Sequence, residues 1–189
     1  MSPAARKTEL RREALARRRA AHEAAGPGSA GVLSSVLAGY RGVPLAGYMP
    51  LRNEIDPLPA MAEAAAHGPV GVPVIRAPHQ PLVFSRWQPD SDMVEGAFRA
   101  RVPRREFLMQ PEILIVPLVA FSREGGRLGY GGGFYDRTLE MLRKACPVLA
   151  IGFAYGAQEM DDLPLEPTDQ PLDMIVTERE TIDTGARLR

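Results

Sequence analysis

The chain has 189 residues, of which 45% are hydrophobic and 24% are charged, as in an average globular domain. This length and composition exclude a wholly disordered or fibrous chain and predict one domain over residues 1–189. Lysine and arginine together number 23, as do aspartate and glutamate, which disfavours a nucleic-acid binder that depends on net charge.

The cysteine content and the apolar runs exclude further classes. With Cys146 as the only cysteine, neither an internal disulfide nor a multi-cysteine metal site can form. No apolar run approaches the roughly 18 residues that a membrane span needs. These features are typical of a cytoplasmic protein with no membrane partner. We also expect a monomer and no nucleic-acid partner.

The first half of the chain predicts helices and strands in alternation. Residues 3–24 predict a helix, because alanine, leucine, arginine and glutamate dominate there. The elements predicted next are a helix over 30–40, a strand over 45–49, a helix from the loop 53–57 to about residue 67, and strands over 70–76 and 81–87. Residues 88–111 are the least regular part.

The second half contains the clearest buried strand, ILIV at 113–116, which is short, apolar and rich in β-branched residues. The segments predicted after it are a glycine-rich loop at 125–133, a helix over 134–144, a strand over 148–151, a loop over 156–171 and a strand over 172–176. This alternation predicts an α/β fold with three layers, α/β/α. We expect a mostly parallel open sheet with the basic N-terminal helix packed at its rim.

The glycine-rich segment from Gly125 to Arg137 is the most informative part of the sequence. Glycines let backbone N–H groups approach an anion, and the N-terminus of the following helix adds a partial positive charge. Arg127 offers a bidentate contact to phosphate, and Asp136 offers a carboxylate for a Mg²⁺ ion on that phosphate. The segment has neither the Gly-Lys-Ser/Thr ending of a Walker loop nor a complete GxGxxG, and a plain connection whose glycines only serve turns remains the alternative.

This segment, RLGYGGGFYDR, preceded by ILIVPLVAF and followed by a helix, resembles the central motif of the 5-formyltetrahydrofolate cyclo-ligases, also called methenyltetrahydrofolate synthetases. KTELR near the start, YMPLRNEID, and the C-terminal IGFAYGAQ and LDMIVTE resemble that family in the same order. The resemblance implies ATP- and Mg²⁺-dependent conversion of 5-formyltetrahydrofolate to 5,10-methenyltetrahydrofolate, with release of ADP and phosphate. Phosphorylation of the formyl oxygen would create a leaving group that N10 of the folate displaces, which demands positioning and charge neutralisation more than a protein nucleophile.

The resemblance also implies roles for residues. It assigns ATP binding to Lys7, Arg11, Arg127, Leu128, Gly129, Tyr130, Gly131, Gly132, Gly133, Phe134 and Tyr135. It assigns folate binding to Met49, Glu54 and Tyr135, and Mg²⁺ to Asp136 and Asp173. No residue is assigned as a certain catalytic group, and Lys7, Arg127 and Tyr135 are expected to position the reactants.

Lys7 and Arg11 lie four residues apart and share one face of the first helix. Without the resemblance, a solvated face paired with Glu9 and Glu13 would be the simpler interpretation. That interpretation is kept for the other arginines of the helix, Arg12, Arg17, Arg18 and Arg19, and replacing Arg18 is expected to do little.

Three alternatives to the cyclo-ligase stay open. They are an enzyme using the same ATP loop on another small molecule, a folate- or nucleotide-binding protein without turnover, and an anion-binding domain like those of sugar-phosphate isomerases. Several positions depart from the usual family pattern: Leu118, Ser122, Thr168 and the segment Arg99 to Pro103.

Overall fold

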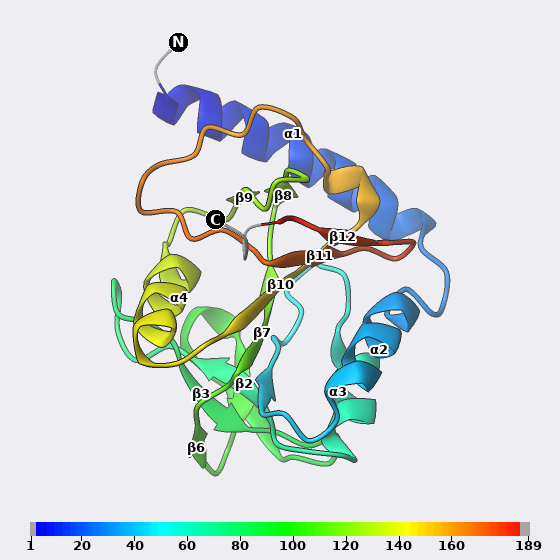
Figure 1. Ribbon diagram of the computed structural model, residues 1–189, viewed down its shortest axis with the longest axis vertical. Coiled ribbons are helices and arrows are strands. Elements are labelled where there is room, and N and C mark those ends of the chain that lie inside the picture. Colours follow the sequence, from blue (N-terminus) through cyan, green and yellow to red (C-terminus); the bar gives the residue numbers. More distant parts are fainter. Residues whose placement is uncertain (1–2, 186–189) are drawn as a thin grey trace.

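The computed structural model describes residues 3–185, of which Pro3 and Ala4 only by their backbone. Its centre is an eight-stranded sheet of order β12-β11-β10-β7-β1-β2-β3-β6 (Figure 1). The bounds are β1 Leu45–Ala46, β2 Val70–Val74, β3 Val83–Arg86, β6 Leu108–Met109, β7 Ile113–Pro117, β10 Leu149–Phe153, β11 Met174–Val176 and β12 Thr181–Asp183. The five strands from β11 to β2 run parallel, and β12, β3 and β6 are antiparallel to their neighbours. The predicted mostly parallel open sheet is confirmed.

Alternate residues of the central strands pack on opposite faces, which is why these strands read as continuous apolar runs. Ile113 and Ile115 of β7 join a cluster with α2 (Gly31–Leu37) and α3 (Leu58–Ala65), whereas Leu114 and Val116 join one with α4 (Phe134–Ala145). Figure 1 shows α4 on one side of the sheet and α2 and α3 on the other. The three layers are therefore those that the sequence predicts.

Helix α1 (Pro3–Ala24) lies across the carboxyl ends of the parallel strands, beside the segment that follows β10 (Figure 1). A third apolar cluster fixes it there, formed by Ala14 with Val119, Ala120, Leu128 and Met160. Because ligands of open α/β sheets bind at this edge, α1 borders the region where a site is expected.

Several predicted boundaries are corrected. Strand β1 is shorter than 45–49. The Gly47 N–H still donates to the Gly71 carbonyl of β2 at 3.0 Å, but the chain then turns away, and the Tyr48 hydroxyl donates to the Ile55 carbonyl at 2.7 Å. The irregular residues 88–111 contain a separate ribbon of β4 (Met93–Glu95) and β5 (Arg101–Pro103) around the 3₁₀ turn η2 (Ala97–Arg99), besides β6. Strand β12 was not predicted. Two further 3₁₀ turns are η1 (Ala38–Tyr40), which continues α2, and η3 (Gly156–Gln158).

The expected glycine-rich loop over 125–133 is in fact two structures. Strands β8 (Ala120–Phe121) and β9 (Arg127–Leu128) form a hairpin, and Gly125, with φ of +90°, makes its turn. Only the five residues from Gly129 to Gly133 remain as a loop before α4. Gly125 and Gly126 thus serve a turn.

Gln158 of η3 holds the start of the loop after β7 to the end of β10. Its side chain, 1% exposed, donates to the carbonyls of Leu118 at 2.9 Å and Val119 at 3.0 Å, and accepts from the Tyr155 N–H at 2.9 Å. These bonds satisfy three buried backbone groups at the edge where the site lies.

Replacing Gln158 by methionine keeps the side-chain length but removes these bonds. We expect Gln158→Met to lower the free energy of unfolding by about 2–3 kcal/mol in urea titrations, because buried polar groups lose their partners. The control is Gln88→Met, at an exposed position. Equal losses in the two variants would contradict the role given to Gln158.

Candidate functional site

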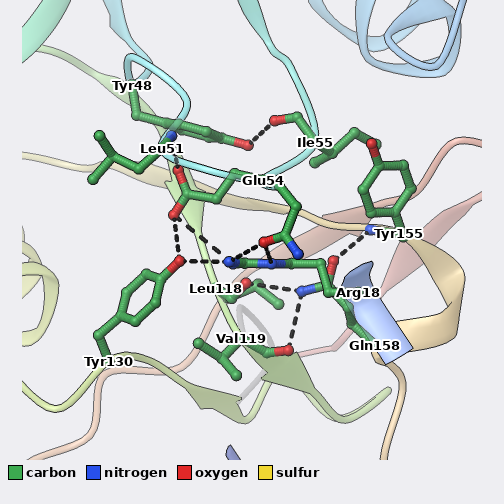
Figure 2. A network of polar contacts seen from close by, with 11 residues as sticks. Arg18, Tyr48, Leu51, Glu54, Ile55, Leu118, Val119, Tyr130, Tyr155 and Gln158 are labelled. Atoms are coloured by element: carbon green, nitrogen blue, oxygen red, sulfur yellow. Dashed lines mark hydrogen bonds and ion pairs between the residues drawn. The ribbon is translucent and has the colours of Figure 1, made fainter. Parts of the chain in front are cut away.

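Two loops meet at the point in the sheet where the strand order reverses, between β1 and β7. Strand β1 pairs with β2 on one side and with β7 on the other, and it is at such a reversal of strand order that open α/β sheets bind ligands. The loop after β1 carries Glu54, and the loop after the β8–β9 hairpin carries Tyr130. The Tyr130 hydroxyl donates to Glu54 Oε1 at 3.1 Å (Figure 2). The predicted folate acid and the glycine loop are therefore in direct contact.

Glu54 is a buried carboxylate, 5% exposed. Its Oε2 accepts from the Leu51 N–H at 2.8 Å, and its Oε1 accepts from Tyr130 and lies 3.9 Å from Arg18 Nη1. Burial raises the pKa of Glu54 above its ordinary value, and the Leu51 N–H, Arg18 and Tyr130 oppose that rise. The side chain is thus a buried acceptor held by three neighbouring groups.

The expectation that Arg18 lies on a solvated helix face is wrong. Arg18 is 1% exposed, and its Nε and Nη2 donate to Asn53 Oδ1 at 3.0 and 2.7 Å. Nη2 also donates to the Tyr130 hydroxyl at 2.7 Å. Arg18 follows Lys7 by eleven residues, or three helical turns, so it falls on the face that α1 turns toward the site.

The glycine loop is fixed from α1. Arg11 Nε donates to the Gly129 carbonyl at 2.8 Å, and a side chain at Gly131 would meet the Arg11 guanidinium at 3.5 Å. Gly131 and Gly133 have φ of +99° and +63°, a region that favours glycine, and Gly133 is the N-cap of α4. The conformation of the loop therefore favours glycine at both positions.

Arg127 and Asp136, predicted to hold phosphate and metal, form an ion pair of 2.6 Å. Asp136 Oδ1 also accepts from the Gln170 N–H at 2.9 Å, and Arg127 donates to the Gln170 carbonyl at 2.5 Å. Strand β9 and helix α4 bring the two residues together and join them to the segment that precedes β11.

Asp173, the second predicted metal ligand, has structural partners. Its Oδ2 accepts from the Ala150 N–H at 2.7 Å and from Arg143 at 3.1 Å. Residues 3–185 contain no group of three or more His, Cys, Asp or Glu side chains placed to bind a metal ion. A Mg²⁺ ion held partly by nucleotide phosphates needs only one or two carboxylates, and Asp136, with a side chain 27% exposed, fits that role better than Asp173 at 9%.

Lys7 pairs with acids that the sequence did not single out. Its Nζ lies 3.2 Å from Glu166 and 3.8 Å from Asp169, both in the segment between β10 and β11. The acids of its own helix pair elsewhere, Glu9 with Arg12 and Glu13 with Arg17. Lys7 and Arg11 therefore face the segment between β10 and β11 and the glycine loop, and their predicted contact with ATP stays a prediction.

The remaining predicted residues surround these contacts. Met49 is half-buried against the α2–α3 side, and Phe134 and Tyr135 against the α4 side, whereas Leu128 is buried under α1. Burial and the nearby Glu54 raise the pKa of Tyr135, so its hydroxyl stays protonated. An open cavity of about 570 Å³ adjoins the network, lined by Leu15, Arg18, Arg19, His22, Glu23, Arg52 and Asn53.

The sequence missed Arg18 and its partner Asn53. The helical spacing from Lys7 through Arg11 to Arg18 was a usable signal, because positions i, i+4 and i+11 share one face. Asn53 stands beside Glu54 in the sequence, but nothing in its neighbours indicates a bond to α1.

The sheet is mostly parallel, and a glycine loop and a buried acid lie near the place where its strand order reverses. This arrangement is typical of an α/β protein that binds its ligand at the carboxyl edge of the sheet. The comparison with known families makes this specific. The model of the 5-formyltetrahydrofolate cyclo-ligase family matches residues 3–178, and the chain belongs to that family.

Individual relatives agree with this placement. The chain is 31% identical to the 5-formyltetrahydrofolate cyclo-ligase of Mycolicibacterium smegmatis over 96% of this chain and 98% of that one. It is 41% identical to the Haemophilus influenzae protein of the same name, but that match covers 48% of this chain and 51%, about half, of the relative. The solved structure of Aquifex aeolicus 5,10-methenyltetrahydrofolate synthetase is similar with a TM-score of 0.72 and 27% identity, over 94% of this chain and 92% of that one.

The structural role of Asp173 is tested against an exposed acid. Asp173→Asn weakens the bonds to Ala150 and Arg143, and we expect it to lower the free energy of unfolding by about 1–3 kcal/mol. The control is Glu140→Gln, at an exposed acid of α4 that pairs with the exposed Lys144, and it should change the free energy of unfolding little. Thermal unfolding of both variants checks this, and equal losses in the two would contradict the structural role of Asp173.

Proposed function

We propose that the chain catalyses the ATP-dependent conversion of 5-formyltetrahydrofolate to 5,10-methenyltetrahydrofolate, with release of ADP and phosphate. The observation that carries the proposal is the contact of 3.1 Å between Tyr130 of the glycine loop and Glu54. It joins a loop suited to phosphates to an acid suited to a pterin ring, as a reaction between ATP and a folate demands.

The nucleotide half consists of the glycine loop and the residues around it. The triphosphate would lie on Gly129 to Gly133, at the N-terminus of the twelve-residue α4, where backbone N–H groups and the helix dipole favour an anion. Lys7, Arg11 and Arg127 would add positive charge, and Leu128, Tyr130, Phe134 and Tyr135 would border the nucleotide. A bound Mg²⁺ would neutralise phosphate charge, held by Asp136 and, by the resemblance, Asp173.

The folate half consists of Glu54, Met49 and Tyr135. The Glu54 carboxylate would accept hydrogen bonds from the amino and N–H donors of the pterin. A carboxylate has about four lone-pair sites, and the Leu51 N–H and the Tyr130 hydroxyl take two of them. Met49 and the protonated Tyr135 would supply apolar contact and a hydroxyl donor.

The proposed chemistry then depends on placing ATP and the folate side by side. The formyl oxygen would take the γ-phosphoryl group, N10 would attack the activated carbon, and phosphate would leave. No side chain needs to act as a nucleophile, so Lys7, Arg127 and Tyr135 would position the reactants and neutralise charge. We keep the expectations of one domain, a monomer and a cytoplasmic location as proposals. None of the helices within residues 3–185 is long and apolar enough to cross a membrane.

The assay mixes the protein with 5-formyltetrahydrofolate, ATP and Mg²⁺ and follows the absorbance of the methenyl product. Product formation that requires both ATP and the folate supports the proposal. No product with the unmodified protein overturns it, and would favour another substrate or a protein that binds without turnover.

Glu54→Gln tests the folate half. The amide keeps the size of the side chain but removes the charge, so the pterin loses charge-assisted hydrogen bonds worth about 1–3 kcal/mol each. We expect a raised KM for the folate or a loss of turnover, with ATP affinity by calorimetry unchanged. Equal activity of wild type and Glu54→Gln would contradict the assignment of Glu54.

Gly132→Val tests the nucleotide half. Gly132 does not have positive φ, unlike Gly131 and Gly133, so a side chain there acts by occupying space rather than by straining the backbone. An added Cβ would lie 3.0 Å from the Phe134 ring and in the path of a bound anion. We expect weaker ATP binding in calorimetry, and an unchanged affinity would rule out the loop as the phosphate site.

A further inference from the structure

Arg18 is an almost fully buried arginine on a helix whose other arginines are largely exposed. Its side chain is 1% exposed, and its Nη1 is buried without a hydrogen-bond partner among residues 3–185. The nearest acid is Glu54, 3.9 Å from Nη1, with a side chain 4% exposed. Figure 2 shows the guanidinium with Glu54 and Tyr130 beside it.

Burying a charge in this way is costly unless the opposite charge is nearby. The two groups compensate each other, because the carboxylate without Arg18 would lose its nearest cation in a dry site. The groups that face Glu54 are Arg18 on α1, Arg52 and Tyr48 on the loop after β1, Tyr130 in the glycine loop and Tyr135 on α4. Arg18 and Arg52 are the cations of this set, and Arg52 is exposed.

We infer that Arg18 is a positioning residue for folate binding: it keeps Glu54 ionised and fixed, and so sets the affinity for the folate without touching it. The inference rests on the proposed function. Arg18 acts on Glu54 by two routes, directly by charge and through the Tyr130 hydroxyl, which accepts from Arg18 and donates to Glu54.

The role predicts a particular effect on pH dependence. Burial already raises the pKa of Glu54, and Arg18 opposes that rise. Without Arg18, the carboxyl binds its proton up to a higher pH, so folate binding is lost at a higher pH as the solution is acidified. An arginine that only stabilised the fold would leave this midpoint in place.

The experiment measures steady-state turnover of 5-formyltetrahydrofolate over the acid and neutral range, at saturating ATP and Mg²⁺. Arg18→Met should raise the folate KM by about tenfold or more and move the acid limb of kcat/KM to higher pH, with the KM for ATP nearly unchanged. Arg18→Lys should recover part of the loss, since it restores the charge but not the planar fork. Arg12→Met, at an exposed arginine of the same helix, is the control and should match wild type.

Two further variants separate positioning from folding. Tyr130→Phe removes only the bridging hydroxyl from a half-exposed side chain, and should raise the folate KM in the same direction even if Arg18→Met does not fold. In a double-mutant cycle, Arg18→Met should add little to Glu54→Gln, because both act on one carboxylate.

The outcomes are distinct. No turnover by wild type overturns the proposed function and this inference with it. Turnover by wild type with an unshifted acid limb, or with Arg18→Met and Glu54→Gln additive in the folate KM, overturns the inference alone. If Arg18→Met does not fold, an unchanged folate KM in Tyr130→Phe overturns the inference alone.

Discussion

A buried guanidinium needs buried partners, and this requirement shapes the candidate site. Arg18 extends from α1 toward the loops after β1 and β9, where Asn53, Glu54 and Tyr130 surround it. These partners belong to two loops that follow different strands, so one side chain joins α1, the loop after β1 and the glycine loop. The position of Glu54, the acid proposed to bind the pterin, follows from this arrangement.

Helix α1 links the two halves of the proposed site. Lys7 and Arg11, near its N-terminus, face the segment before β11 and the glycine loop, and Arg18 faces Glu54. The apolar contacts of Ala14 with the β8–β9 hairpin fix the helix between these ends. A helix held in this way would set the distance between the proposed nucleotide and folate positions, which would matter for the proposed reaction because that reaction depends on placing two substrates.

The sequence predicted the parts of the fold that carry a strong local pattern. The apolar runs of β7 and β10 indicated buried parallel strands, and the glycine loop before α4 remains the predicted phosphate site. Strands of two or three residues, such as β8, β9 and β12, have no periodicity to detect. Arg18 was misassigned because its spacing gives the face of a helix but not what packs against that face, and the partners of Lys7 lie some 160 residues away, at Glu166 and Asp169.

The central claim is that the charge of Arg18 maintains Glu54 as a buried carboxylate. Its most direct test is an NMR titration of protein labelled with ¹³C at the glutamate side-chain carboxyls, with Glu54 assigned by its absence in Glu54→Gln. In wild type the Glu54 resonance should titrate above the pH of an ordinary glutamate, because burial raises its pKa, and in Arg18→Met its midpoint should rise further, because Arg18 opposes that rise. A midpoint that is the same in both proteins would contradict the account.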